Sequence, residues 1–207
     1  MNWGNAALLG DEIIQWRNAT LLSEGLYELS GLLRGRRGTE SATGTHRVGE
    51  KFVVLASEGL YRTPLPSTEI GKTSYYKAMV AGGNWDDAPD TPYAFNAGSL
   101  RCFSPVQISG SRNGSSDLTI TWMRRTRWYG EWLDNVDVPL FEDSENYTID
   151  VLSGTQVVRT LTATSTTANY TAAQQTADFG STQAAISVAV YQMNSIAGRG
   201  TAGKAIV

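Results

Sequence analysis

The second half of the chain contains segments in which apolar and polar residues alternate with a period of two. They read "DLTITW", "NYTIDVL" and "AISVAVYQM". Because successive side chains of a strand point to opposite faces, this pattern indicates strands with one buried and one solvent-facing side. The gaps are short and include turn signals such as Ser153-Gly154, which predicts an antiparallel β-sandwich. The apolar positions that share a face are Leu118, Ile120 and Trp122; Tyr147, Ile149 and Val151; and Ile186, Val188 and Val190.

The first half of the chain also indicates strands, with less regular alternation. The stretch "DEIIQWRNATLLSEGLYELSGLL" has the pattern of a hairpin with Gly25 at its bend. The segments "EKFVVLA" and "TSYYKAMVAGG" are rich in β-branched and aromatic residues. Residues 83–105 contain Pro89, Pro92 and Pro105 and predict an irregular connection. We therefore predict an all-β chain, with a small β-rich domain and its linker at 1–103 and an antiparallel sandwich at 104–207.

Composition favours a globular protein without a strong electric field. The 207 residues are 41% hydrophobic and 18% charged, and the formal net charge is −3. With so weak a charge, no global electric field argues for nucleic acid or a membrane surface as a partner. Cys102 is the only cysteine, so no internal disulfide forms. We see neither a signal peptide nor an apolar run of about 20 residues, and expect folding in the cytoplasm without membrane insertion.

Few residues in the sequence are candidates for catalysis. His46, the only histidine, lies in the Gly/Thr-rich stretch "ESATGTHRVGEKF", which is typical of a turn or surface histidine. No nucleophile elbow of the Gly-x-Ser-x-Gly type occurs. The acidic run "DNVDVPLFEDSEN" at 134–146 does not match a calcium loop, and its carboxylates leave a glycan hydrolase as the least favoured alternative. We expect no enzymatic activity, no cofactor and no metal ion.

The segment "MRRTRWYGEW" combines arginines with aromatic residues directly after a predicted strand. Arginine beside aromatic rings can bind nucleic acid or a sugar by stacking and cation–π contact. Trp, Tyr and Arg are also enriched at protein interfaces, a mild indication of a partner surface. Alternatively, the arginines pair with the acidic run and close a long loop, which we favour because the overall charge is slightly negative. The candidate interface or glycan contacts are Arg124, Arg125, Arg127, Trp128, Tyr129 and Trp132.

A second arginine-rich segment, "LSGLLRGRRGTES", interleaves arginine with glycine. It is not a phosphate-binding loop, because no Gly-Lys-Ser/Thr follows, and glycine at this frequency disfavours a helix. We interpret Gly31, Gly35 and Gly38 as turn positions with positive φ. The candidates for a structural clamp that holds neighbouring segments are Arg34, Arg36 and Arg37.

At the family level, "SGLLRGRRGTE" followed by "HRVGEKFVVL" resembles the tail-hub proteins of siphophages, above all the large tail-tip protein of alphaproteobacterial gene transfer agents. The resemblance continues through "YYKAMVAGGNWDDAP" and from "SPVQISGSRNG" to "ENYTIDV", and it covers nearly the whole chain. In that family the corresponding segment is the C-terminal portion of a longer hub chain.

The second half is also similar to a fibronectin type III sandwich. Trp122 and Tyr147 match the tryptophan of the second strand and the tyrosine of the third, and "ISVAVYQMNSIAGRG" matches the sixth strand and its turn into the seventh. Ile186 replaces the tyrosine that usually opens the sixth strand, which implies that the tyrosine-corner hydrogen bond is absent.

The tail-hub resemblance implies a structural component of the tail tip in the virion, involved in baseplate assembly and host attachment. The implied partners are other tail proteins, namely the hub, the distal tail protein and fibres, in a homotrimer around the tail axis. The resemblance carries over no catalytic residue. A carbohydrate-binding adhesin that recognises a host surface glycan or protein is the alternative.

Overall fold

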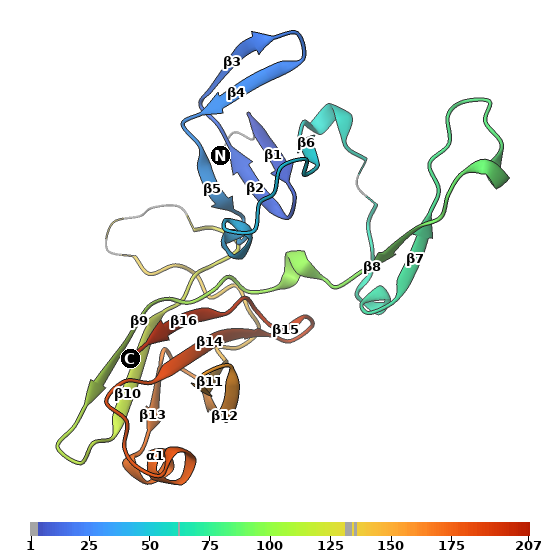
Figure 1. Ribbon diagram of the computed structural model, residues 1–207. Coiled ribbons are helices and arrows are strands. Elements are labelled where there is room, and N and C mark those ends of the chain that lie inside the picture. The colour runs from blue at the N-terminus through green and yellow to red at the C-terminus, as the bar shows by residue number, and fades with distance from the viewer. Residues whose placement is uncertain (1–3, 62, 131–133, 135) are drawn as a thin grey trace. The chain divides into compact units, whose positions relative to one another are not determined.

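The computed structural model describes residues 4–61, 63–130, 134 and 136–207. The chain divides into two compact units, residues 1–63 and 64–207, whose elements are labelled in Figure 1. Most of the regular elements in these residues are strands, so the predicted all-β class is confirmed. The division lies between residues 63 and 64, because residues 64–103 group with the sandwich. The domain ranges 1–103 and 104–207 stay a prediction.

The N-terminal unit is built around an antiparallel sheet with strand order β5-β2-β1-β6. Gly25 has a φ of 73° in the turn between β3 and β4, so the hairpin predicted there is confirmed. The elements of this unit are β1 (Ala6–Leu9), β2 (Glu12–Gln15), β3 (Asn18–Ser23), β4 (Leu26–Ser30), β5 (Leu33–Arg36), η1 (Glu40–Ala42), β6 (Phe52–Val54) and η2 (Ser57–Gly59).

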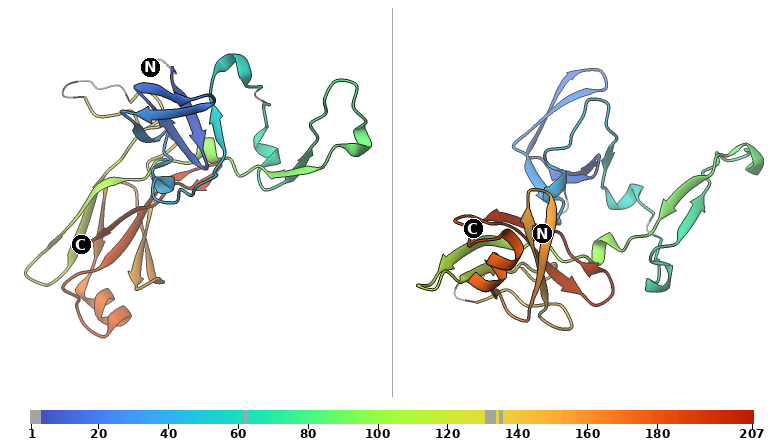
Figure 2. Two further views of the ribbon diagram at one scale, coloured as in Figure 1. Left: turned by 45° about the horizontal axis from the view of Figure 1, so that its top comes forward. Right: turned by 60° about the horizontal axis from the view of Figure 1, so that its bottom comes forward.

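The second unit begins with 3-10 helix η3 (Ser67–Glu69) and a two-stranded hairpin of β7 (Thr73–Tyr76) and β8 (Thr91–Ala94), drawn in two views in Figure 2. The prediction of an irregular connection over residues 83–105 is therefore wrong at β8, which is a regular strand. Pro92 is tolerated because each strand of a two-stranded ribbon has one edge without ladder hydrogen bonds. Short 3-10 helices η4 (Trp85–Asp87) and η5 (Gly98–Leu100) lie on either side of β8 in the sequence.

The rest of this unit is a sandwich of two antiparallel sheets. One sheet has the order β13-β10-β9 and the other the order β12-β11-β14-β16, with β15 paired to the end of β14. This distribution of strands is that of a fibronectin type III sandwich, as expected. The strands are β9 (Val106–Arg112), β10 (Leu118–Met123), β11 (Tyr147–Ser153), β12 (Gln156–Ala163), β13 (Thr167–Tyr170), β14 (Ser187–Asn194), β15 (Gly198–Arg199) and β16 (Gly203–Ile206).

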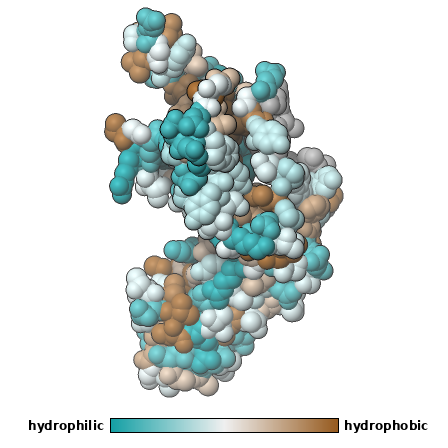
Figure 3. Space-filling view, turned by 90° about the vertical axis from the view of Figure 1, so that its right-hand side faces the viewer, coloured by the Kyte–Doolittle hydropathy of each residue, from teal (hydrophilic) through white to brown (hydrophobic). Residues whose placement is uncertain are grey.

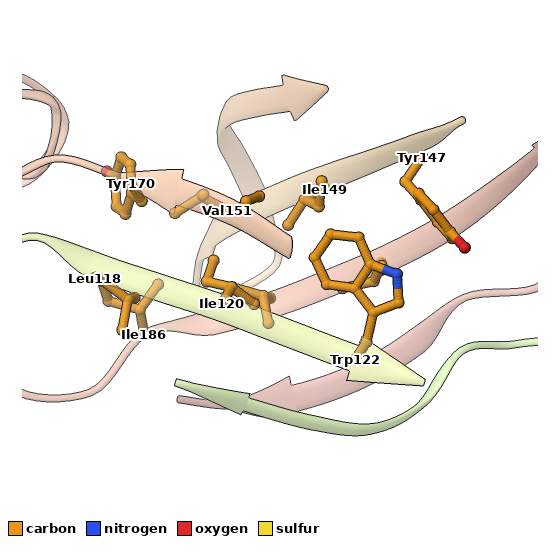
Figure 4. Close-up of a cluster of buried hydrophobic side chains, with 11 residues drawn as sticks. Leu118, Ile120, Trp122, Tyr147, Ile149, Val151, Tyr170 and Ile186 are labelled. Atoms are coloured by element: carbon orange, nitrogen blue, oxygen red, sulfur yellow. The ribbon is translucent and has the colours of Figure 1, made fainter. Parts of the chain in front are cut away.

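The apolar faces predicted from the alternation meet in the core of the sandwich, as Figure 4 shows. Leu118 and Ile120 of β10 pack in one cluster with Ile149 and Val151 of β11, and all of them are almost completely buried. At one end of the cluster the indole of Trp122 meets the ring of Tyr147 edge-on, with centroids 5.0 Å apart.

Helix α1 (Ala172–Phe179) corrects the expectation that the second half contains only strands. Thr171 and Gln174 form a capping box, in which each side chain accepts a hydrogen bond from the backbone N–H of the other. Gly180 ends the helix with a φ of 81°. These signals are readable in the sequence, but the helix contains few large apolar residues, so apolar periodicity does not reveal it.

Candidate functional site

A long loop connects β10 to β11 and is held at its base by a buried ion pair. Arg127 donates from Nε and Nη2 to Oε1 of Glu142, at 3.0 and 2.9 Å. The side chains are only 9% and 4% exposed, respectively. Asn194 donates to the other oxygen of Glu142 at 2.6 Å, and Arg127 Nη1 donates to the carbonyl of Ser99 at 3.1 Å. We call Arg127, Glu142 and Asn194 the loop clamp.

The residues next to the loop clamp in sequence form an exposed aromatic cluster. Trp128 and Tyr129 directly follow Arg127, and Phe141 directly precedes Glu142. The ring of Phe141 lies 6.2 Å from that of Trp128 and 5.7 Å from that of Tyr129, measured between centroids. Each of the three side chains is about half exposed or more. Trp128, Tyr129 and Phe141 are called the aromatic cluster below.

The backbone of the aromatic cluster has an unusual conformation. Tyr129 has a φ of 55° and Phe141 a φ of 50°, in the left-handed region that bulky residues seldom adopt. Such conformations cost on the order of 1–3 kcal/mol each and persist only where surrounding contacts impose them. The loop clamp supplies such contacts within one or two residues of both positions.

The other arginines of the segment also make contacts within this unit. Arg124 donates to Asp137 at 2.5 Å, and its Nε lies 3.8 Å from Glu145. Arg125 lies over the ring of Phe103, with its Cζ 5.1 Å from the ring centroid, and donates to Ser104 Oγ at 3.5 Å. Arg124 and Arg127 thus meet the acidic run, as the intramolecular interpretation expects. Trp132 lies outside the described residues.

Sequence reasoning missed two members of this site. Phe141 is the aromatic residue of the acidic run at 134–146, a segment in which the carboxylates are the more obvious signal. Asn194 comes from the end of β14 and carries no local signal.

Cys102 is buried and lies near Glu142. Burial raises the pKa of its thiol to about 12, with a further contribution from Glu142. The thiol therefore stays protonated and is a poor nucleophile at neutral pH.

In the N-terminal unit, the carboxylate of Glu12 collects hydrogen bonds from several segments. Glu12 is fully buried on β2. Arg34 of β5 donates to it from Nε and Nη2, at 2.8 and 2.7 Å, and the backbone N–H of Gly35 donates at 2.5 Å. His46 Nε2 lies 2.6 Å from the same carboxylate, and Nδ1 lies 2.7 Å from Glu50. We call these five residues the Glu12 clamp.

Arg34 therefore joins β5 to β2, the role that the sequence suggested for it. Arg36, also on β5, donates from Nε to Gln15 Oε1 at 3.0 Å. Arg37 follows in the turn with a φ of 58°. Gly35 is needed at its position because its φ is 59° and a Cβ there would lie 2.9 Å from Glu40 Cγ. The positive φ predicted for Gly31, Gly35 and Gly38 is confirmed.

The charge state of the Glu12 clamp follows from its geometry. Because each ring nitrogen of His46 faces a carboxylate oxygen, both nitrogens must donate, which requires the imidazolium form. Glu50 foremost and Glu12 next raise the pKa of His46 above its ordinary 6.5. Arg34 foremost lowers the pKa of Glu12 from 4.5 to about 2, and His46 lowers the pKa of Glu50. The sequence placed His46 in a turn but did not reveal its two carboxylate partners.

The Glu12 clamp predicts a stability that depends on pH in both directions. The contribution of His46, whose pKa is raised on folding, is complete below pH 6.5 and is lost as pH rises through its folded pKa. The contributions of Glu12 and Glu50, whose pKa values are lowered, are complete above pH 4.5 and are lost on acidification. The N-terminal unit should therefore be most stable between these values.

Because His46 is the only histidine, an NMR titration of its imidazole signals is unambiguous. The expected midpoint lies above 6.5 in the native chain and shifts downward in Glu50→Gln, which loses the strongest contribution. A midpoint at or below 6.5 in the native chain contradicts the bridged geometry.

Among the described residues, no group of three or more His, Cys, Asp and Glu side chains is arranged to hold a metal ion. Within the same residues, no helix has the length and apolar character needed to cross a membrane.

Comparison with known proteins gives a match to a family model over part of the chain and similarity to solved structures. No curated protein sequence matches the chain. Among solved structures, the rat CD45 extracellular region, domains d3–d4, is similar over 73% of this chain and 71% of that chain, with 12% sequence identity and a TM-score of 0.36. Residues 1–53, which lie within the N-terminal unit, match the model of the family described as Rcc01698-like, C-terminal.

Proposed function

We propose that the chain is a structural component of the tail tip or hub of a phage or phage-like particle, where it takes part in baseplate assembly and host attachment. The tail-tip assignment comes from the resemblance of its sequence segments. The assembly role is supported by one observation in particular, an amphipathic hairpin whose apolar face is uncovered. The proposal assigns the chain to the virion and gives it no catalytic activity.

Hairpin β3–β4 has one apolar face, and its opposite face carries polar residues together with Leu26, which alternates with Glu28. In its register Ala19 is opposite Leu29 and Leu21 is opposite Tyr27, and these pairs share one side of the ribbon. The pair of Thr20 and Glu28 lies on the other side. Leu21 and Tyr27 are 58% and 59% exposed. Figure 3 shows brown apolar atoms among teal and white ones at the top of the view, the end at which Figure 1 labels β3 and β4.

An isolated two-stranded hairpin is at best marginally stable in water, and one apolar face normally packs against a core. The N-terminal unit offers little core of its own, since its buried apolar residues within 4–61 are Ala6, Ala7, Ile14 and Ala42. Hairpin β7–β8 also exposes aromatic side chains, Tyr75 and Tyr93, although its register places them on opposite faces of the ribbon. Surfaces of this kind are expected to be covered by other chains in an assembly.

We take the partner of hairpin β3–β4 to be the same hairpin of further copies, in a homotrimer. The apolar face carries no charged side chain, so its self-association meets no like-charge repulsion. The other proposed partners are the hub, the distal tail protein and fibres.

Sedimentation equilibrium of the full chain tests the assembly role. We expect the native chain to associate as a trimer with rising concentration, and Leu21→Ser with Tyr27→Ser to stay monomeric. The control is Thr20→Ser with Glu28→Gln, which alters the opposite face of the same ribbon and should associate like the native chain. A native chain that stays monomeric, or an apolar-face variant that associates normally, contradicts the role of this hairpin.

Electron cryomicroscopy of intact particles tests the tail-tip assignment separately. Density for the sandwich and the N-terminal sheet is expected at the distal end of the tail, repeated around its axis. Finding the chain in the capsid, or finding it absent from the particle, overturns the assignment.

A further inference from the structure

We propose that the aromatic cluster is a binding site for a neutral polysaccharide. This goes beyond the assembly role, since the cluster lies on the sandwich whereas hairpin β3–β4 belongs to the N-terminal unit. Loss of either function therefore leaves the other measurable.

The first argument is that aromatic rings are exposed on a positioned loop. Trp128 and Tyr129 are 51% and 67% exposed, although Phe141 contacts both of their rings. A loop that served only to cover the core would bury these rings, because each one carries a large apolar surface. In this loop the buried side chains are instead those of Arg127 and Glu142, and the aromatic rings are exposed to solvent.

The second argument is preorganisation. The buried pair of Arg127 and Glu142 fixes the chain immediately before Trp128 and immediately after Phe141. Thr126 adds a hydrogen bond from its hydroxyl to the carbonyl of Trp128 at 2.6 Å. Rings that are held in place before binding lose little conformational freedom when a ligand stacks on them. The left-handed backbone at Tyr129 and Phe141 fits a strained functional loop.

The third argument concerns the class of ligand. The rings of Trp128 and Tyr129 are inclined at 45° and 60° to that of Phe141, so the cluster offers separate facets rather than one flat stack. The C–H faces of consecutive sugar rings fit such facets. Arg124 forms an ion pair with Asp137, whose side chain is 77% exposed, and Arg127 forms one with Glu142. This balance of charge disfavours polyanions such as nucleic acid or acidic polysaccharides, while exposed carboxylates accept hydrogen bonds from sugar hydroxyls.

The site is open and shallow, so a single site should bind weakly, with a Kd of roughly millimolar. Several copies in one assembly would raise the effective affinity through multivalency. Weak binding of this kind is measured well by affinity electrophoresis, in which an immobile polymer retards the chain in a native gel.

The experiment uses the full chain with dextran, mannan and hydroxyethyl cellulose as neutral polymers, and alginate and hyaluronan as acidic ones. We expect at least one neutral polymer to retard the native chain. Trp128→Ala and Tyr129→Ala should each weaken the retardation roughly tenfold in apparent Kd. Both positions are exposed, so the urea midpoint of the variants should match that of the native chain.

The matched control is Tyr75→Ala, because Tyr75 is 68% exposed on hairpin β7–β8, close to the 67% of Tyr129. Its retardation should equal that of the native chain. Retardation by acidic polymers alone overturns the ligand class, and retardation that survives both cluster variants overturns the location. No retardation by any neutral polymer overturns the proposal itself, as does binding of the cluster to another tail protein instead.

Discussion

Replacing Arg127 with alanine is expected to lower the free energy of unfolding of the sandwich by about 3–5 kcal/mol. The change leaves the carboxylate of Glu142 almost completely buried with Asn194 as its remaining side-chain hydrogen-bond donor in the loop clamp. It also removes the donor to the carbonyl of Ser99. Leaving a buried charge without its counter-ion lowers the free energy of unfolding by far more than the intact pair raises it. Urea unfolding followed by tryptophan fluorescence measures the loss as a lower midpoint.

Two further variants separate the buried pair from the surrounding charges. Arg124→Ala removes an ion pair whose partner Asp137 is largely exposed, so its cost should be about 1 kcal/mol or less. Replacing Arg127 with methionine and Glu142 with leucine together removes both charges, and should recover most of the stability lost in Arg127→Ala. Equal costs for Arg124→Ala and Arg127→Ala would show that burial of the loop clamp is not what matters.

Replacing Glu12 with alanine is expected to unfold the N-terminal unit while the sandwich stays folded. The change removes the acceptor for Arg34, for His46 and for the buried backbone N–H of Gly35. The loss should be about 3 kcal/mol or more, since a buried donor is left without a partner and a charged network is broken. A unit with so small an apolar core has little stability to spare.

Amide hydrogen exchange with mass spectrometry reads this result segment by segment. In Glu12→Ala the peptides from β1, β2 and β5 should lose their protection, whereas those from β10, β11 and β14 should keep it. Glu28→Ala is the matched control, because Glu28 is a glutamate on the exposed polar face of β4 in the same unit. Protection that persists across β2 and β5 in Glu12→Ala contradicts the importance of this clamp.

Local patterns predicted most of the strands correctly, because a strand is encoded by residues that are neighbours in sequence. Leu118, Ile120 and Trp122 point into the core as their spacing requires, and Gly25 and Gly154 occupy turns with positive φ. Helix α1 also has a local code in its capping box, but apolar alternation is the wrong signal for it. The misassignment of β8 has a related cause, since a proline argues against a strand only where both edges are paired.

What the sequence determined alone is therefore the all-β class, the faces of the sandwich strands and the presence of arginines near acids. Only the tertiary structure decided which acid each arginine meets, that His46 bridges two carboxylates, and that Phe141 joins Trp128 and Tyr129. These outcomes depend on segments that are distant in sequence, such as Glu12 and His46, which are separated by 34 positions. Which distant residues meet depends on how the strands and turns arrange the chain in space. The residues next to Glu12 or His46 in sequence do not encode that arrangement.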